Sequence, residues 1–381
     1  MYRHRLLEKT LASAEKTFPV TIITGPRQSG KSTLLIQYFK KRPHTLLSLD
    51  DPSVRARVLD DPAGFLAGLQ RPVILDEIQY VPEIATYIKL LVDRDRKPGT
   101  WFLTGSQQFS VMKNVSESLA GRAAVLTLPT FNLNERGGAA MVGEFMSGST
   151  YPEPAVNRAI DRRLWYSSYL QTYLERDVRA LMNVSDIREF EQCVRLLAAR
   201  TGQELNYSAL SSQIGVSMPT VKRWVAALEA SYIIYLLPPF YENYGKRIIK
   251  SPKVYFYDTG LVAYLLGIED EKTLMNGPLA GAIFETAVVS ELVKSRFAAG
   301  IKPELYFWRA QSGIEIDVLI SEKGVILPCE IKLSTTIKPQ FYKNIISWQG
   351  LAGHEGGMLI TNSADKLPLP AGIRNIHWKD L

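Results

Sequence analysis

The chain has 381 residues and a net charge of +7, with 46% hydrophobic and 22% charged residues. This balance excludes an intrinsically disordered protein, and the length predicts two or three domains. Two cysteines and four histidines exclude a disulfide framework and a histidine-based metal centre. Because no apolar run reaches about 18 residues, we expect a cytoplasmic protein without a membrane span. The positive charge permits contact with nucleic acid but does not establish it.

A glycine-rich loop between a predicted strand and a predicted helix is the first motif. Residues 20–23 are apolar or β-branched, residues 31–40 carry apolar side chains at helical spacing, and the loop between them fits G-x-x-x-x-G-K-[ST]. Backbone N–H groups of such a loop wrap phosphates, and Lys and Ser reach the β/γ-phosphates and Mg²⁺. The sequence therefore predicts an ATP site made of Gly25, Pro26, Arg27, Gln28, Ser29, Gly30, Lys31, Ser32 and Thr33. The alternative is a glycine loop that only turns the chain.

The next predicted strands carry polar groups toward this loop. Residues 72–75 form an apolar strand that ends at Asp76 and Glu77. Because open α/β sheets bind ligands at the carboxyl ends of their strands, we expect Asp76 to hold Mg²⁺ and Glu77 to polarise the attacking water. The strand at residues 101–103 is followed by Ser106, which is predicted to sense the γ-phosphate. The alternative for Asp76 and Glu77 is that they are two acids that only start a loop. The alternative for Ser106 is that it is an ordinary turn residue.

Arg122 follows this strand and is a candidate catalytic residue. An arginine beside a transferring phosphate stabilises the charge that develops there. The alternative is a solvated or salt-bridged arginine. Up to about residue 150 the strand and helix patterns alternate, which predicts a parallel sheet covered on both faces.

The middle of the chain is predicted to be mostly helical and to contain a helix-turn-helix. Residues 205–214 and 220–228 have helical patterns, a tight turn lies between them, and Ser208 and Ser217 are candidate helix caps. Residues 233–237 and 253–257 are candidate strands of a wing. The predicted DNA-facing residues are Thr220, Lys222, Arg223, Lys246, Arg247 and Lys250. The alternative is a winged helix used only for packing or oligomerisation.

The last part of the chain contains a possible nuclease site. Asp317 lies in one apolar strand, and Glu330 and Lys332 lie in the next, as in the D…(D/E)-x-K pattern of restriction-endonuclease-like folds. Asp317 and Glu330 can share Mg²⁺, Lys332 can orient or deprotonate water, and Glu285 can join from the preceding helix. The alternatives are solvated ion pairs, or a nuclease fold that has lost activity and only grips DNA.

As a set, these motifs resemble a large prokaryotic family of AAA-type ATPases joined to a C-terminal domain of uncertain role. The matching stretches cover nearly the whole chain, at residues 23–33, 75–79, 103–106, 119–122, 173–177 and 255–261. The resemblance implies ATP binding, and it implies that Arg122 can act across a subunit interface in a homo-oligomer. It says little about biological role.

We therefore expect an α/β protein of three parts. These are a P-loop parallel-sheet ATPase domain at residues 1–150, a helical and winged-helix domain at 151–272, and an α/β restriction-endonuclease-like domain at 273–381. Three hypotheses for the function follow. The first is a Mg²⁺- and ATP-dependent enzyme that processes DNA or acts in defence. The second is a nucleotide-driven signalling or assembly switch without chemistry on nucleic acid. The third is a DNA-binding regulator that uses ATP only for conformation.

Overall fold

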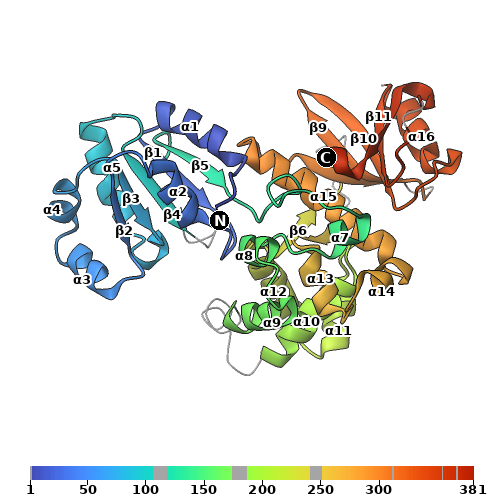
Figure 1. Cartoon of the computed structure of the whole chain (residues 1–381), viewed down its shortest axis with the longest axis horizontal. Helices are drawn as coiled ribbons and strands as arrows, with labels where there is room; N and C mark the ends of the chain where they lie inside the picture. Colours follow the sequence, from blue (N-terminus) through green and yellow to red (C-terminus); the bar gives the residue numbers. More distant parts are fainter. Residues whose placement is uncertain are drawn as a thin grey trace. The chain divides into compact units, whose positions relative to one another are not determined.

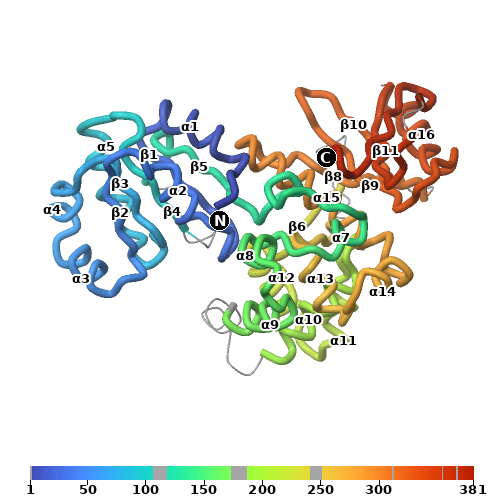
Figure 2. Tube along the Cα trace, viewed as in Figure 1, coloured from blue at the N-terminus to red at the C-terminus, as the bar shows by residue number. Residues whose placement is uncertain are grey.

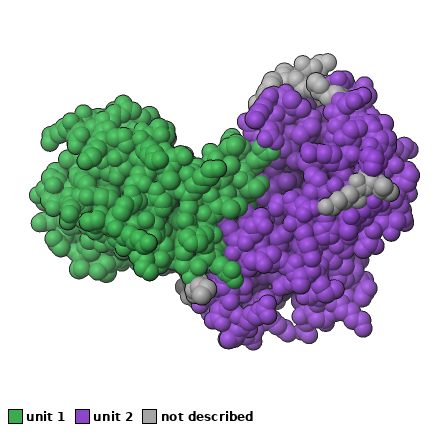
Figure 3. Space-filling view, turned by 45° about the horizontal axis from the view of Figure 1, so that its top comes forward, with its two compact units in different colours: residues 1–131, 230–232, 294–302 green, residues 132–229, 233–293, 303–381 purple. Residues whose placement is uncertain are grey.

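The computed structural model describes residues 2–105, 118–173, 187–240, 251–310, 313–353, 355–365 and 368–381. The chain divides into two compact units (Figure 3). The first comprises residues 1–131, 230–232 and 294–302, and the second comprises 132–229, 233–293 and 303–381. Among the described residues, no helix combines the length and the apolar character that a membrane crossing requires.

The first unit is built on a five-stranded parallel sheet with the strand order β2-β3-β4-β1-β5 (Figure 1). Its strands are β1 (Val20–Thr24), β2 (Thr45–Ser48), β3 (Val73–Asp76), β4 (Trp101–Gly105) and β5 (Ala123–Thr127). The helices are α1 (Leu7–Thr17), α2 (Lys31–Phe39), α3 (Pro52–Asp60), α4 (Pro62–Ala67) and α5 (Ile84–Arg94), with a 3-10 turn η1 (Ile78–Tyr80). The predicted parallel sheet is confirmed. Strand β4 lies between β1 and β3.

Alternation along the strands divides the apolar side chains of this sheet between two cores. Ile22 packs in one core with the inner faces of α3, α4 and α5, whereas its neighbour Ile23 packs in the other core with α1 and α2. Trp101 and Phe102 divide in the same way on β4. Both faces are therefore covered by helices, which is why the strands read as continuous apolar runs.

The second unit begins with a set of helices, and Figure 2 traces the chain through them. These are α7 (Val142–Ser147), α8 (Pro152–Val156), α9 (Arg162–Tyr173), α10 (Ile187–Ala199), α11 (Tyr207–Ile214), α12 (Met218–Ala230), α13 (Thr259–Leu265) and α14 (Glu271–Asn276). Strands β6 (Ile234–Leu237) and β7 (Lys253–Phe256) pair antiparallel. The order of helix, turn, helix and strand pair is the one that the sequence predicts.

The turn between α11 and α12 is made as expected, but one predicted cap is wrong. Gly215 ends α11 in the left-handed conformation with φ 82°, and the Ser217 hydroxyl accepts a hydrogen bond from the Thr220 backbone N–H at 3.3 Å. Asn206, and not Ser208, caps α11 by accepting from the Ala209 N–H at 2.9 Å. Ser208 lies inside the helix. Asn is as good a cap as Ser, so local preference does not decide between them.

Asp258 ties three segments of the second unit together. Its carboxylate accepts hydrogen bonds from the backbone N–H of Thr150 and of Leu261, the latter at the start of α13. It also accepts from the hydroxyls of Thr150 at 2.8 Å, Ser149 at 3.3 Å and Tyr166 at 2.6 Å. The carboxylate is fully buried, so these donors replace the water that a buried charge loses.

The rest of the second unit is a mixed five-stranded sheet with the order β12-β11-β10-β9-β8. The strands are β8 (Leu305–Arg309), β9 (Glu315–Glu322), β10 (Val325–Lys332), β11 (Gly357–Thr361) and β12 (Ile373–His377). Strands β8, β9 and β10 are antiparallel neighbours, and β10, β11 and β12 are parallel. Helix α15 (Ala280–Ala298) precedes the sheet, and α16 (Lys343–Ala352) packs on it through Ile345 and Trp348.

Candidate functional site

The glycine-rich loop joins β1 to α2 as the sequence predicts. Gly25 has φ 143°, and a Cβ there would lie 2.1 Å from the backbone oxygen of Leu128, so only glycine fits. Lys31 is 6% exposed, and its Nζ donates to the carbonyl oxygens of Gly25 at 3.1 Å and Pro26 at 2.8 Å. The ammonium therefore lies inside the curve of the loop, where a bound phosphate would meet it.

Ser32 and Asp76 meet across the sheet edge. The Ser32 hydroxyl lies 2.8 and 2.9 Å from the two carboxylate oxygens of Asp76. A hydroxyl and a carboxylate so placed form an oxygen pair of the kind that Mg²⁺ prefers. The residues present therefore fit the predicted magnesium ion, and both belong to the first unit.

Thr104, at the end of β4, positions both acids of β3. Its hydroxyl donates to Asp76 and accepts from the backbone N–H of Glu77 at 3.1 Å. Glu77 has left-handed backbone angles, φ 58° and ψ 50°, and its carboxylate accepts a hydrogen bond from the Gln79 amide. In the sequence, the available signal for Thr104 was that it directly follows the apolar strand at residues 101–103.

Arg5 is a supporting residue that the sequence analysis missed. It precedes α1, is 5% exposed, and donates to the carbonyl oxygens of Ser29 and Pro129, both at 2.7 Å. Its guanidinium also stacks on the Phe131 ring at 4.8 Å. The loop is thereby tied to the segment that follows β5. No sequence pattern marks this arginine among the other basic residues near it.

Arg122 lies at the opposite end of the parallel strands from the glycine-rich loop. It directly precedes β5, whose first residue Ala123 pairs with Val20, whereas the loop follows the other end of β1. Its guanidinium donates to Asp93 at 2.5 Å and to the carbonyl of Ala120 at 2.9 Å. In cis, the alternative of a salt-bridged arginine is correct. The predicted role across a subunit interface stays a prediction, and Ser106 lies outside the described residues.

The predicted carboxylates of the C-terminal sheet converge on one ammonium group. Lys332 Nζ lies 2.8 Å from Asp317 Oδ2 and 2.6 Å from Glu330 Oε2. Asp317 also accepts from the Ile331 backbone N–H at 2.9 Å. Glu330 is 2% exposed, and its Oε1 has no hydrogen-bond partner among the described residues. A buried carboxylate oxygen without a donor is a candidate cation ligand.

Glu285 joins this cluster from α15, together with a lysine that the sequence analysis did not assign to it. The Tyr255 hydroxyl donates to Glu285 Oε1 at 2.5 Å. Lys253 Nζ lies 3.8 Å from the same oxygen and 2.5 Å from Glu315 Oε1. In the sequence, the available signal for Lys253 was its position as a single lysine at the start of an apolar strand. Among the described residues, no three Asp, Glu, His or Cys side chains are close enough to hold a metal, so a cation here would need further ligands from water or a phosphate.

The pKa values of the cluster follow from burial and from these neighbours. Burial, and then Asp317, raises the pKa of Glu285 to about 7, against Lys253. Burial and Asp317 likewise raise the pKa of Glu330 to about 8, against Lys332. Burial also acts to raise the pKa of Asp317, but Lys332 and Lys253 outweigh it and hold that pKa below its usual value. Of these three carboxyl groups, Asp317 is therefore the one that its neighbours hold most strongly in the charged form.

The helix-turn-helix presents part of its predicted contact surface to solvent. Lys222 and Arg223 are exposed and Thr220 is half-buried on α12, whereas Trp224 and Val225 are core residues as expected. Lys222 Nζ lies 5.7 Å from the centroid of the Tyr207 ring. Lys246, Arg247 and Lys250 lie outside the described residues.

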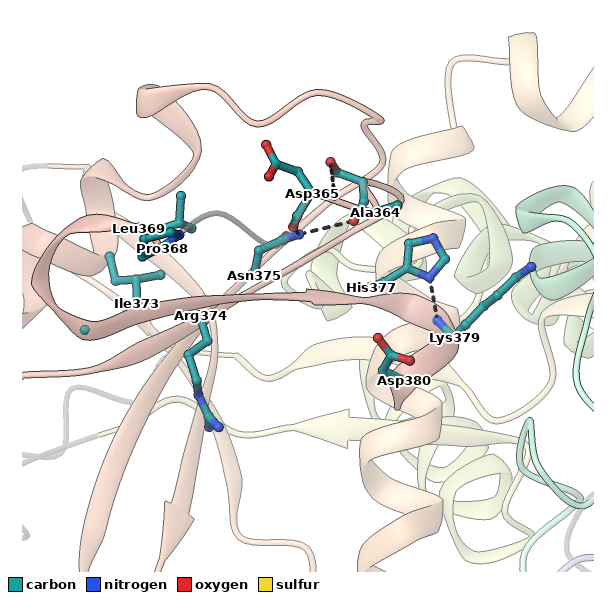
Figure 4. Close-up of a pocket in the computed structure, with 12 residues that line it drawn as sticks. Ala364, Asp365, Pro368, Leu369, Ile373, Arg374, Asn375, His377, Lys379 and Asp380 are labelled. Carbon is teal, nitrogen blue, oxygen red and sulfur yellow. Dashed lines mark hydrogen bonds between the residues drawn. The ribbon is translucent and has the colours of Figure 1, made fainter.

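A cavity of about 630 Å³ beside β12 carries no assigned chemistry. Figure 4 shows Asp365 and Asn375 side by side, with Arg374 directed away from them. The Asn375 amide donates to the backbone oxygens of Ser363 at 3.2 Å and Asp365 at 2.7 Å. These bonds serve the fold of the loop.

Family models match three successive parts of the chain. Residues 17–136 match an AAA domain. Residues 143–272 and 280–381 match two models that are both described as domains of unknown function, DUF8612 and DUF4143. The first part is therefore an AAA-type P-loop domain, as the motifs predict.

Two relatives match most of the chain. Over 319 residues the chain is 33% identical to the uncharacterized protein Rv2008c of Mycobacterium tuberculosis, covering 84% of this chain and 71% of the relative. The same values hold for Mb2031c of Mycobacterium bovis. Among solved structures, the Walker-type ATPase PABY2304 of Pyrococcus abyssi gives a TM-score of 0.42 at 14% identity, covering 68% of this chain and 94% of that one. The Thermotoga maritima RuvB Holliday junction branch migration motor gives 0.32 at 17% identity, covering 61% and 89%.

Proposed function

The chain belongs to the family of the mycobacterial protein Rv2008c, and from this premise we propose that it hydrolyses ATP with Mg²⁺ and couples this reaction to DNA. The observation that supports ATP hydrolysis most strongly is the meeting of loop and strand at Ser32 and Asp76. We also propose that the chain has three functional parts, which meet at residues 150 and 272.

Each residue of the nucleotide site has a role that its position supports. The loop from Gly25 to Thr33 would wrap the phosphates, and Lys31 would turn from the loop carbonyls to the β- and γ-phosphates. Mg²⁺, when bound, would neutralise phosphate charge between Ser32 and Asp76. Glu77 would accept a proton from the attacking water, after its carboxylate leaves the Gln79 amide.

ATP binding is tested with Lys31→Ala. Removing one charge-assisted contact should weaken ATP binding about tenfold or more, measured by calorimetry with Mg²⁺ present. Lys97→Ala is the matched control, because Lys97 is an exposed lysine of the same unit. An ATP affinity in Lys31→Ala equal to that of the control would refute the assignment.

The hydrolysis step is tested with Glu77→Gln, which keeps the size of the side chain but cannot accept the proton. We expect ATP binding to be retained and the hydrolysis rate to fall about a hundredfold or more. Hydrolysis at the parental rate would mean that a different residue positions the water.

The helix-turn-helix is the proposed DNA-binding part. Lys222 and Arg223 are exposed on α12, in the position where a recognition helix meets phosphates. Each lost phosphate contact should reduce the slope of log K against log salt by about 0.9 on duplex DNA. If Lys222→Glu and Arg223→Glu both bind duplex DNA like the parent, the module serves only packing.

A second candidate function is metal-dependent cleavage of nucleic acid by the C-terminal sheet. The observation that favours it is the convergence of Asp317 and Glu330, with one buried Glu330 oxygen that lacks a donor. These two carboxylates would hold the cation, and Lys332 would remain beside the water or the scissile phosphate. The C-terminal part of the chain, at residues 273–381, would then have a restriction-endonuclease-like fold.

Asp317→Asn is the test of this second function. It should abolish Mg²⁺-dependent cleavage and leave ATP hydrolysis unchanged, because the two sites lie in different units. Glu322→Gln, near the exposed end of the same strand, is the control. Cleavage should be scored on linear, branched and single-stranded DNA, and cleavage by Asp317→Asn at the parental rate would exclude this site.

A further inference from the structure

We propose that a cavity of the second unit binds an unpaired strand of nucleic acid and leads it to the Asp317 cluster. The cavity has a volume of about 890 Å³, within the range of about 300–1,000 Å³ that is typical of ligand sites. The inference rests on the proposed cleavage function, which it deepens by naming the form of the substrate and the residues that hold it.

The walls of the cavity come from the helix-turn-helix on one side and the C-terminal sheet on the other. Residues 202–208 include the start of α11, and Met218 and Lys222 belong to α12. Arg309 of β8 and Glu315 of β9 complete the lining, with residues 251–253. The predicted DNA-binding helix and the predicted nuclease sheet therefore face the same space within one compact unit.

The cavity adjoins the carboxylate cluster through residues of its wall. Lys253 and Glu315 line the cavity, and Lys253 Nζ also lies 3.8 Å from Glu285 Oε1. Glu315 and Asp317 are two residues apart on β9, so alternation places them on one face of the strand. At Gly202 in the cavity wall, a Cβ would lie 3.7 Å from the Glu285 carboxylate. A phosphate that reaches Lys253 is therefore beside the cluster.

The charges of the lining favour an anion. Lys222, Lys253 and Arg309 face two acids, Glu204 and Glu315. Both acids are neutralised within the wall, since Arg309 lies 3.3 Å from Glu204 and Lys253 lies 2.5 Å from Glu315. Among the residues that the structure describes, Lys222 interacts only with the Tyr207 ring.

Aromatic and polar groups in the wall suit bases better than a small anion alone. The Tyr207 ring and the Met218 thioether offer apolar surface, and Gln203 and Asn206 offer amides. A ring beside cations is the usual platform for unpaired bases, which stack on it while the phosphates meet the positive charge. A duplex keeps its bases stacked inside and offers this cavity no ring to hold, so we infer a single strand.

The test is binding of a fluorescent twelve-residue oligothymidylate to the full chain, in EDTA so that no cleavage occurs. We expect Tyr207→Ala to weaken binding about fivefold or more through the loss of base stacking, and Tyr207→Phe to retain it. Lys222→Glu should reduce the salt slope by about 0.7 for the lost phosphate contact. Lys272→Glu on α14 is exposed, does not line the cavity and should bind like the parent.

The outcomes separate this inference from the functions on which it rests. Parental binding by both Tyr207→Ala and Lys222→Glu, or no binding of the oligonucleotide by the parent, overturns it. Displacement of the oligonucleotide by free thymidine monophosphate at equal concentration would assign the cavity to a small anion and also overturn it. Cleavage that is unchanged in the cavity variants would overturn it while the nuclease function stands. Cavity-dependent binding without cleavage would support it while the nuclease function fails.

Discussion

Two buried threonines on the same face of the nucleotide-site sheet give a sharp test of how that site is held. Thr104 on β4 donates to Asp76 and accepts from the Glu77 N–H. Thr21 on β1 is equally buried, but its hydroxyl has no hydrogen-bond partner among the described residues. Substitution by valine removes each hydroxyl and conserves the shape of the side chain. We therefore expect opposite effects from the same chemical change.

The sizes of the two effects follow from these contacts. Thr104→Val removes a hydrogen bond to a charged group and leaves the Glu77 N–H without its acceptor, so it should lower the free energy of unfolding by about 2–4 kcal/mol. Thr21→Val removes a hydroxyl that is buried without a partner, so it should raise that free energy by about 1 kcal/mol. Because Thr104 fixes the backbone of Glu77, the ATP hydrolysis rate should fall about tenfold or more in Thr104→Val only.

The local stability of the sheet is best measured by hydrogen exchange of peptides from β1, β3 and β4 in increasing urea, since the chain has two units and a global transition would mix them. ATP hydrolysis is measured on the same preparations. Equal destabilisation by the two substitutions would refute the reasoning. The contacts of Thr104 with the two acids would then add nothing to the effect of removing an unpartnered hydroxyl at Thr21.

Other substitutions test the remaining features. Gly25→Ala should destabilise the first unit by about 2–6 kcal/mol, because its methyl meets the Leu128 backbone oxygen and its φ is strained. Gly121→Ala, where nothing lies within 4 Å, should cost only about 1–2 kcal/mol. Urea unfolding measures the free energy of unfolding of both variants. Asp258→Ala should lower the stability of the second unit by about 3–5 kcal/mol, and an unchanged urea midpoint would contradict this. Arg122→Ala should leave ATP affinity unchanged in titration calorimetry. Hydrolysis that returns when this variant is mixed with exchange-competent Lys31→Ala would support a shared site, and its absence would remove that support.

Local motifs made the nucleotide site predictable. The loop from Gly25 to Ser32 has fixed spacing, and a strand that ends in Asp76 can bring its acid only to the carboxyl edge of a parallel sheet. The convergence of Asp317 with Glu330 and Lys332 was also predictable, since neighbouring strands and a two-residue alternation place these side chains together.

What sequence reasoning missed depends on contacts between distant segments. Arg122 follows the strand at residues 101–103 in the sequence, but β5 begins beside Val20, which places the arginine at the opposite end of the parallel strands from the loop. Lys253 begins a candidate strand of the predicted wing, yet it is 4% exposed and pairs with Glu315. Arg5 contacts the loop at Ser29 and, 124 positions along the chain, the carbonyl oxygen of Pro129 after β5. Periodicity carries no information on such pairings.

The bonds of Asp258 bear on how the chain can be divided into autonomous pieces. A cut at residue 150 would remove Thr150 and Ser149 from the carboxylate that their hydroxyls and N–H groups satisfy. A cut at residue 272 would separate Lys253 and its neighbour Tyr255 from Glu285 and expose half of a charged cluster. The boundaries at residues 150 and 272 that the sequence patterns predict thus pass through two buried polar networks. The described segments from Asn132 onward, apart from those that fold with the first unit, should therefore remain associated as one body after limited proteolysis.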